Sequence, residues 1–360
     1  MDAFRPSRRM VVLGLAGLLG TGGTLLWLQR LHTQPVQRNV SSPFPYTSGD
    51  HSTYRGHRGG VLTGAWSPDS ERIASAGLDK TVQVWDATTG DHLLTNHDHA
   101  QIILNVAWSP DGTRIASASA DQTVQVCKVV GSEDVIIPNG SVLVYGGHSG
   151  WVLAVAWSPD GTRLVSAGED QTVQVWDADT GDTLFAYHGH SDAVNSVAWS
   201  PDGTLIASAG DDETVQVWDA VGGKHIFTYF GHPKLVNVIA WSPDGTRIAS
   251  GSADRTVQVW DATTGKNAFI YRGHSRWVFA VAWSPDGARI ASGSVDKTVQ
   301  VWDASTGGNV FTYRHHSFDV NAVAWSPDGA RIASVSGDGT VQVWKSPLIP
   351  GRLISCEVQR

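Results

Sequence analysis

The stretch Ala198-Trp199-Ser200-Pro201-Asp202 decides the fold of this chain, because it is one of seven copies of the same five-residue phrase. Five of the six spacings between successive copies are 42 residues, and the remaining one is 49. The tryptophans of the seven copies are Trp66, Trp108, Trp157, Trp199, Trp241, Trp283 and Trp325. A period of about 40 to 45 residues that recurs this often predicts a stacked-repeat architecture, in which every repeat is one small structural unit.

Two further positions recur with the same period. A histidine stands nine residues before each of these tryptophans, and a Val-Gln-Val-Trp phrase ends nineteen residues after it. The histidines are His57, His99, His148, His190, His232, His274 and His316. The closing residues of the second phrase are Trp85, Cys127, Trp176, Trp218, Trp260, Trp302 and Trp344. The second unit, in which cysteine replaces tryptophan, is also seven residues longer than the others and is the least regular.

The unit that begins at His190 contains four short segments with strand character and no helical period. The predicted strands cover residues 194–199, 205–209, 214–218 and 225–230. Between the first two, Ser200-Pro201-Asp202-Gly203 suits a type I turn, with proline at its second position and glycine at its fourth. Four short antiparallel strands cannot bury both faces of their sheet alone, whereas seven such sheets arranged radially bury each other.

Composition narrows the class of protein further. Hydrophobic residues make up 41% of the 360 residues, which is enough for a core, and charged residues make up only 17%. The formal net charge is −8, and residues 1–40 are basic, so the rest of the chain is acidic. An acidic body without a basic block argues against nucleic acid as a partner. Two cysteines cannot build a disulfide framework, and no Cys-His spacing indicates zinc.

With its Gly-His dipeptide, its Trp-Asp dipeptide and a turn aspartate between them, the unit resembles the WD-repeat. The likeness extends over residues 50–345 and implies an all-β, seven-bladed β-propeller. Blades of that family hold a buried tetrad: the Gly-His histidine, a serine of the second strand, the turn aspartate and the tryptophan of the third strand. Carried over to this chain, where Cys127 leaves the second set incomplete, the resemblance implies the tetrad residues His57, Ser75, Asp79, Trp85, His99, Ser117, Asp121, His148, Ser166, Asp170, Trp176, His190, Ser208, Asp212, Trp218, His232, Ser250, Asp254, Trp260, His274, Ser292, Asp296, Trp302, His316, Ser334, Asp338 and Trp344.

The repeated serine, histidine and aspartate invite a catalytic interpretation, which the repetition itself opposes. Seven equivalent active sites on one ring are implausible, and the tryptophan would bury each set. A buried histidine fixed by a carboxylate and a hydroxyl is instead a structural network, which is stabilising when every member is satisfied. Turn geometry accounts for the aspartates of the Ser-Pro-Asp-Gly turns. We therefore predict no catalytic residue, no metal site and no cofactor.

The N-terminus differs from the rest of the chain. Residues 10–28 carry no charge and, as a helix, would span about 28 Å, close to the thickness of a bilayer core. The phrase Ser7-Arg8-Arg9-Met10-Val11-Val12-Leu13 resembles a bacterial twin-arginine export signal, with Val11 and Leu13 where that signal usually has phenylalanine and lysine. We predict a signal-anchor helix within residues 1–28, a polar tether over 29–49, the propeller over 50–345 and a tail over 346–360.

These features predict a location as well. The anchor would be single-pass, and the propeller would lie outside the cytoplasmic membrane of a prokaryote, because arginines precede the apolar stretch. No Ala-x-Ala site follows that stretch, so an uncleaved anchor is favoured over the alternative of a form secreted after cleavage.

For function, the sequence favours a membrane-tethered, non-enzymatic scaffold that binds a protein or peptide partner. In the WD-repeat family, residues three and five positions after the Gly-His histidine point to the top face of the ring. The large apolar residues at these positions, and hence the predicted protein-binding residues, are Ile102, Leu104, Trp151, Leu153, Leu235, Trp277 and Phe279. Such a cluster marks an interaction site if it is exposed; alternatively, these side chains pack over the channel mouth and are partly buried.

Two alternative functions stay open at this point. One is an enzyme or small-ligand propeller that uses the central channel, which would need unrepeated polar residues on the inner strands. The other is a TolB-like envelope propeller, whose repeats share the Trp-Ser-Pro-Asp-Gly-x-Arg-Ile-Ala pattern. The partner's identity does not follow from the sequence.

The ends of the propeller carry a prediction of their own. Residues 50–55 precede Gly56-His57 in the way that residues 267–272 precede Gly273-His274, whereas no clear fourth strand follows Trp344. We therefore predict that residues 51–55 pair with residues 340–344 and close the ring, which removes an open sheet edge. The alternative closing strand is the tail over residues 353–358.

Overall fold

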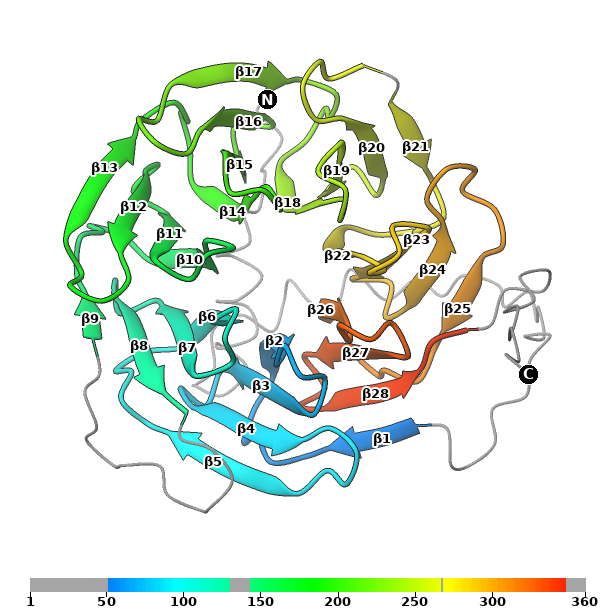
Figure 1. Cartoon of the computed structure of the whole chain (residues 1–360). Coiled ribbons are helices and arrows are strands. Elements are labelled where there is room, and N and C mark those ends of the chain that lie inside the picture. The colour runs from blue at the N-terminus through cyan, green and yellow to red at the C-terminus, as the bar shows by residue number, and fades with distance from the viewer. Residues whose placement is uncertain (1–50, 130–142, 267, 348–360) are drawn as a thin grey trace, which may run out of the picture.

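The computed structural model describes residues 51–129, 143–266 and 268–347, and in these ranges the chain forms 28 strands in seven four-stranded antiparallel sheets. Viewed along its axis, the molecule is a ring of seven blades (Figure 1). The predicted all-β, seven-bladed propeller is therefore confirmed. The proposed anchor and tether, residues 1–49, and the tail beyond residue 347 lie outside the described residues. Within the described part of the chain, no helix is long and apolar enough to span a bilayer.

Figure 1 shows that each blade places one strand nearest the axis of the ring. These inner strands are β2 (Val61–Trp66), β6 (Ile103–Trp108), β10 (Val152–Trp157), β14 (Val194–Trp199), β18 (Val236–Trp241), β22 (Val278–Trp283) and β26 (Val320–Trp325). The second strands are β3 (Arg72–Gly77), β7 (Arg114–Ser119), β11 (Arg163–Gly168), β15 (Leu205–Gly210), β19 (Arg247–Ser252), β23 (Arg289–Ser294) and β27 (Arg331–Ser336).

The outer half of each blade is built from its third and fourth strands. The third strands are β4 (Val82–Asp86), β8 (Val124–Lys128), β12 (Val173–Asp177), β16 (Val215–Asp219), β20 (Val257–Asp261), β24 (Val299–Asp303) and β28 (Val341–Lys345). The outermost strands are β1 (His51–Tyr54), β5 (His92–Asn96), β9 (Leu143–Tyr145), β13 (Thr183–Tyr187), β17 (His225–Tyr229), β21 (Phe269–Tyr271) and β25 (Phe311–Tyr313). We number the blades one to six from β2–β5 to β22–β25, and blade seven comprises β26, β27, β28 and β1.

The first strand in sequence closes the ring. β1 pairs antiparallel with β28, so that His51 lies opposite Trp344 and Tyr54 opposite Val341. The predicted pairing of residues 51–55 with 340–344 is thus confirmed. The alternative closing strand at residues 353–358 is wrong, because β28 already has β27 on one side and β1 on the other.

The Ser-Pro-Asp-Gly turns join inner and second strands in the way predicted. In blade four, Gly203 N–H donates to the carbonyl of Ser200, and Gly203 adopts a positive φ of 71°. A residue without a Cβ takes that left-handed conformation at little cost, which accounts for glycine at the end of the phrase. Ser200 Oγ also donates to Asp202 Oδ1 at 2.6 Å, so the aspartate is used within its own turn.

The core lies in the seams between blades rather than inside any one blade. Between blades four and five, Val215 and Val217 of β16 pack against Val236, Ile239 and Trp241, which come from β18. The other seams repeat this arrangement with equivalent residues. Because every blade buries one face against each neighbour, a single four-stranded sheet gains its stability only within the ring.

The tryptophan of the Ala-Trp-Ser-Pro-Asp phrase locks each seam. In six seams its indole N–H donates to an alanine carbonyl of the preceding blade at 3.1–3.3 Å. In six seams an arginine from the second strand of the preceding blade also lies over the indole, 4.6–5.0 Å from the ring centroid. The seam between blades four and five lacks this cation–π contact, because Leu205 occupies the arginine position facing Trp241.

Candidate functional site

The histidine, serine and aspartate of every repeat meet in one buried network. In blade four, His190 Nδ1 lies 2.7 Å from Asp212 Oδ2, and His190 Nε2 lies 2.7 Å from Ser208 Oγ. The other six blades repeat both contacts at 2.7–3.0 Å. In the six blades with tryptophan, its indole N–H donates to the same serine at 3.2–3.4 Å. The structure therefore brings together the tetrad residues named from the sequence.

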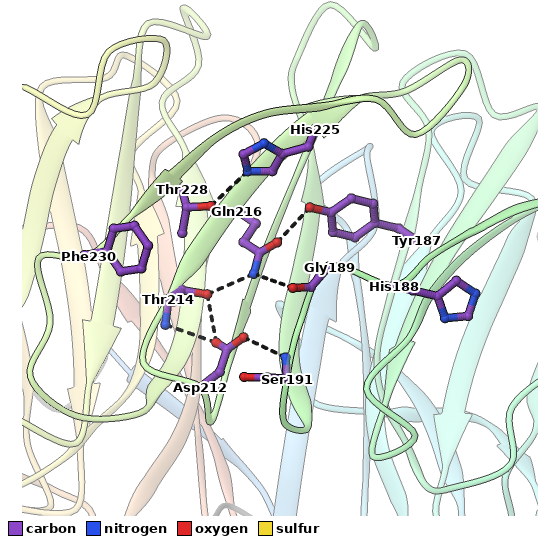
Figure 2. Close-up of a pocket in the computed structure, with 10 residues that line it drawn as sticks. All are labelled: Tyr187, His188, Gly189, Ser191, Asp212, Thr214, Gln216, His225, Thr228 and Phe230. Atoms are coloured by element: carbon purple, nitrogen blue, oxygen red, sulfur yellow. Dashed lines mark hydrogen bonds between the residues drawn. The ribbon is translucent and has the colours of Figure 1, made fainter.

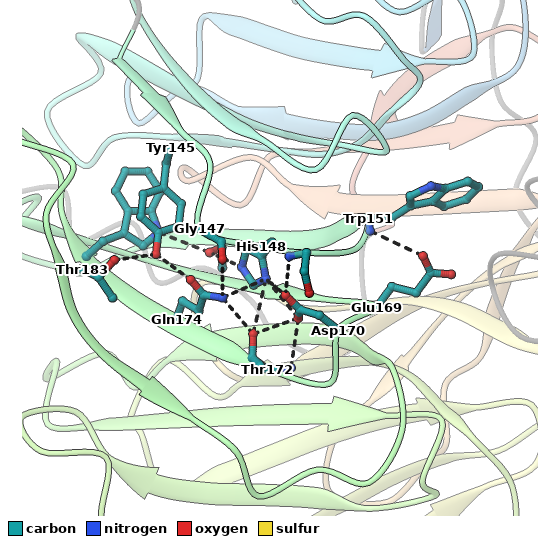
Figure 3. Close-up of polar contacts among 12 residues, drawn as sticks. Tyr145, Gly147, His148, Trp151, Glu169, Asp170, Thr172, Gln174 and Thr183 are labelled. Carbon is teal, nitrogen blue, oxygen red and sulfur yellow. Dashed lines mark hydrogen bonds and ion pairs between the residues drawn. The ribbon is translucent and has the colours of Figure 1, made fainter.

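Each network extends to a tyrosine and a glutamine that the sequence analysis did not identify. At the seam between blades two and three, Tyr145 O–H of β9 donates to Gln174 Oε1 of β12 at 2.6 Å, and the Gln174 amide donates to the Gly147 carbonyl (Figure 3). Six seams contain this pair, because at each a tyrosine of one blade stands 29 residues before the glutamine of the next. That constant spacing is the signal by which the pair could have been found.

The tetrad aspartates are held ionised. Burial raises the pKa of the Asp79 carboxyl, but the hydrogen bond and the electrostatic interaction with His57 outweigh burial and lower the pKa to about 2. The Asp170 carboxyl reaches about 2 by the same balance. The pKa is also lowered against the effect of burial in the remaining blades, at Asp121, Asp212, Asp254, Asp296 and Asp338. These carboxylates accept hydrogen bonds at neutral pH and have no proton to donate.

The top face is only partly as expected. Four of the predicted protein-binding residues are buried, with exposed fractions of 2–7%, and the expectation that they contribute exposed surface is wrong for Leu104, Leu153, Leu235 and Phe279. The inner strands converge near the axis of the ring, so side chains at these positions cover one another. Leu104 and Leu153 belong to an apolar cluster with Leu62 and Ala193, which come from four different blades.

Three predicted residues remain accessible on this face: Ile102, Trp151 and Trp277 are partly buried rather than enclosed. Trp151 packs against the apolar cluster, and its backbone N–H points to Glu169 (Figure 3). Trp277 meets the buried Phe279 edge to face, with ring centroids 6.3 Å apart. The alternative that these side chains pack against one another and are buried is therefore correct for the four leucine and phenylalanine residues. The two tryptophans remain partly accessible to solvent.

Asp319 is the acidic member of the same ring of positions. Burial raises the pKa of its carboxyl to about 6, although Lys297 and Arg276 act in the opposite direction. In the described part of the chain, none of the ion pairs within 4.0 Å includes Asp319. Among the described residues, Asp319 is thus a partly buried carboxyl without an ion-pair partner.

Three of the inner strands contain a buried asparagine. The Asn195 amide donates to the Val236 carbonyl of the next blade at 3.2 Å, and the Asn237 amide to Val278 at 2.9 Å. Asn321 does the same across the closing seam, toward Val61 at 2.8 Å. These asparagines are buried and link neighbouring blades, so they are structural and do not present a reactive channel wall.

A groove on the outer side of the ring was not foreseen. It has a volume of about 580 Å³, and Figure 2 shows its lining residues. Its floor is the blade-four network of Asp212, Thr214 and Gln216, whose polar atoms bond to each other and to Gly189. At one end stands Phe230, which is 77% exposed. The polar groups of the floor are already paired, and the described residues contain no group of three metal-ligating side chains.

Comparisons with known proteins agree with this architecture. A family model described as "WD domain, G-beta repeat" matches seven segments, which together cover about three quarters of the chain: 50–86, 90–127, 139–177, 181–219, 223–261, 265–303 and 307–345. WD repeat-containing protein 1-B of Xenopus laevis is 45% identical over 42 residues, 12% of this chain and 7% of that protein. Protein HIRA homolog of Drosophila melanogaster is 37% identical over 79 residues, 22% of this chain and 6% of that protein. The chain thus matches only a small part of the length of these relatives.

Proposed function

The chain belongs to the family of WD domain, G-beta repeat proteins, and on that premise we propose that it is a non-enzymatic scaffold that binds a protein partner on the top face of its ring. Propellers of this family typically act as platforms for protein interactions. The described residues support the proposal because their serine, histidine and aspartate sets are repeated, buried and internally satisfied. A structural network of this kind leaves recognition to surface loops on a rigid frame.

One observation carries the choice of the top face. The thirteen tryptophans that follow the repeat are all buried, with exposed fractions of 9% or less. Among the described residues, only Trp151 and Trp277 stand outside the repeat, and both keep an open side on this face. Large aromatic side chains at such positions dominate binding energy in protein interfaces. Their partial packing on Leu153 and Phe279 fixes their orientation in advance and lowers the entropy cost of binding.

The test is a comparison of partner capture by two matched variants of the full chain. Trp151→Ala with Trp277→Ala removes both open rings, and we expect loss of the partners that the wild-type chain captures, with the melting temperature nearly unchanged. Phe230→Ala is the control, because it removes a more exposed aromatic ring from the outer side of the ring of blades. Undiminished capture by the double variant, or loss of capture by the control alone, would contradict the top-face proposal.

We also propose that the scaffold is anchored by residues 10–28 and faces the extracytoplasmic side of a bacterial cytoplasmic membrane. The support is the uncharged length of that segment and the twin-arginine-like phrase before it. Export of an already folded chain would suit a ring whose first and last strands must pair. Protease added to intact spheroplasts should digest the propeller. Digestion only after lysis would place it in the cytoplasm, and recovery of the propeller in the soluble fraction would favour a cleaved, secreted form.

A further inference from the structure

Six of the seven seams contain the same pair of aromatic rings. A tyrosine from the outermost strand of one blade stacks on the tetrad tryptophan of the next, with ring centroids 4.2–4.9 Å apart and planes within 13°. The hydroxyl of that tyrosine donates to the glutamine Oε1 of the next blade at 2.6–2.8 Å. Each such tyrosine therefore fills a slot whose floor is an aromatic ring and whose end is a hydrogen-bond acceptor.

The seam between blades one and two lacks both rings. Asn96 stands in the tyrosine position at the end of β5, and Cys127 stands in the tryptophan position on β8. The Asn96 amide is turned toward Asp98, to which it donates at 2.8 Å. The thiol of Cys127 contacts the Ile115 carbonyl at 3.7 Å. The two replacements occupy the positions that face each other across the six other seams, although they lie 31 residues apart in the sequence.

The glutamine that supplies the hydrogen-bond acceptor of the slot is nevertheless present in this seam. Gln125 donates its amide to the Asp98 carbonyl at 3.3 Å, as the glutamines of the other seams donate to the equivalent carbonyl at 3.0–3.4 Å. Its Oε1 therefore faces the place where a tyrosine hydroxyl lies in the six sister seams. Gln125 is about nine-tenths buried, and among the described residues this Oε1 has no hydrogen-bond partner. A buried acceptor without a donor is unfavourable, so the seam gains most from a ligand that brings one.

The slot is also more open than its sisters. Cys127 is partly exposed, whereas the six tryptophans at this position are at most 1% exposed. Val144 lies opposite Gln125 in the pairing of β8 with β9, which places both side chains on the same face of the sheet. Val144 is 54% exposed and gives the rim of the slot an apolar edge, while Leu94 closes its inner end.

We propose that the seam between blades one and two is a binding site for a tyrosine side chain of a partner protein. The ring enters from the outer rim, lies against Cys127 and Val144, and donates its hydroxyl hydrogen to Gln125 Oε1. The six sister seams identify the occupant, because each holds a phenol in this position on the same acceptor. Entry requires the rim side chains to part, which the partial exposure of Cys127 and Val144 permits. This site is on the outside of the ring and does not depend on the top face.

The probe for this site is p-cresol, which reproduces the tyrosine side chain, added to the full chain. We expect it to raise the melting temperature by about 3 °C at about ten times its dissociation constant. Toluene, which lacks the hydroxyl, should raise it less. The matched control is Asn96→Tyr, which places a phenol in the slot covalently; this variant should melt higher than wild type and no longer respond to p-cresol.

A second measurement places the probe in the slot. Alkylation of Cys127, followed by mass spectrometry, should slow in wild type at the same p-cresol concentrations that raise the melting temperature. Equal responses of wild type and Asn96→Tyr, or no protection of Cys127, would overturn the proposal. Tyr46 is the only tyrosine outside the sister seams. A response that appears only in Tyr46→Ala would show that the chain fills its own slot, and the assignment to a partner would be wrong.

Discussion

At the scale of single residues, the pKa of the carboxyl group is shifted in opposite directions in the tetrad aspartates and in Asp319. The tetrad carboxylate of Asp79 accepts from His57, from the Arg58 backbone and from Thr81, and these bonds more than offset its desolvation. Its stabilisation is complete above the unfolded pKa near 3.8 and is lost as pH falls toward 2. Asp319 forms no ion pair with the described residues, and burial raises the pKa of its carboxyl to about 6.

Asp319→Asn should therefore stabilise the fold in a pH-dependent way. The folded pKa of Asp319 lies above the unfolded value of 3.8, so its contribution to stability is greatest below pH 4 and is lost as pH rises through 6. Asparagine removes the cost of ionising a partly buried carboxyl. We expect the variant to melt about 2 °C higher than wild type at pH 7.5 and at an equal temperature near pH 4. A melting difference that does not change between these two pH values would contradict the assignment.

At the scale of elements, a second strand of one blade and the inner strand of the next are joined by a cation–π contact. In the seam between blades three and four, the Arg163 guanidinium lies 4.7 Å from the Trp199 ring centroid and also donates to the Ala220 carbonyl at 2.9 Å. One blade further on, Leu205 replaces the arginine and Trp241 has no cation over it. The same indole is thus covered in one seam and uncovered in the next.

Leu205→Arg should add the missing cation–π contact to the seam between blades four and five. The new guanidinium would lie over Trp241, and we expect the free energy of unfolding to rise by about 0.5–1 kcal/mol. Arg163→Leu is the matched reverse change, which should lower it by a similar amount through loss of the contact with Trp199. Urea unfolding of both variants measures the effect. A destabilised Leu205→Arg would mean that the apolar contacts of Leu205 outweigh the missing cation–π contact.

At the scale of the whole molecule, the ring depends on a strand from the opposite end of the domain. Without β1, the edge of β28 is open and the slot beside Trp85 loses Tyr54, which stacks on that ring at 4.7 Å and bonds to Gln83. Each blade supports the next, so one open seam weakens all seven sheets. Closure by chain ends that are far apart in sequence gives the ring its cooperativity.

Deletion of residues 50–56 should lower the melting temperature by about 10 °C, since it removes a buried tyrosine, its hydrogen bond and a strand pairing. Tyr54→Ala is a milder test of the same contact and should show about half of that loss. Deletion of residues 30–42 serves as the control, because it leaves β1 intact. An unchanged melting temperature after removal of residues 50–56 would show that the closing pair adds nothing to the ring.

The sequence by itself determined the number of blades, the strand order, the tetrads and the closing pair. The number of blades and the closing pair follow from spacing along the chain, which recurs seven times, so that a single irregular unit such as that of Cys127 does not obscure it. The tetrads follow from the resemblance of the repeat to the WD-repeat family. The outer strands were also placed to within one or two residues. Spacing along the chain can be analysed without knowing which blades contact each other.

Tertiary structure alone decided which side chains are accessible. Leu104 and Phe279 stand at positions that the sequence analysis expected to lie on the exposed top face. They are buried because the inner strands converge at the axis and their side chains cover one another. The tyrosine–tryptophan stacks, the isolation of Asp319 and the coincidence of Asn96 with Cys127 arise across seams. Contacts between blades depend on packing in three dimensions, and no pattern within one repeat specifies what the neighbouring repeat places opposite it.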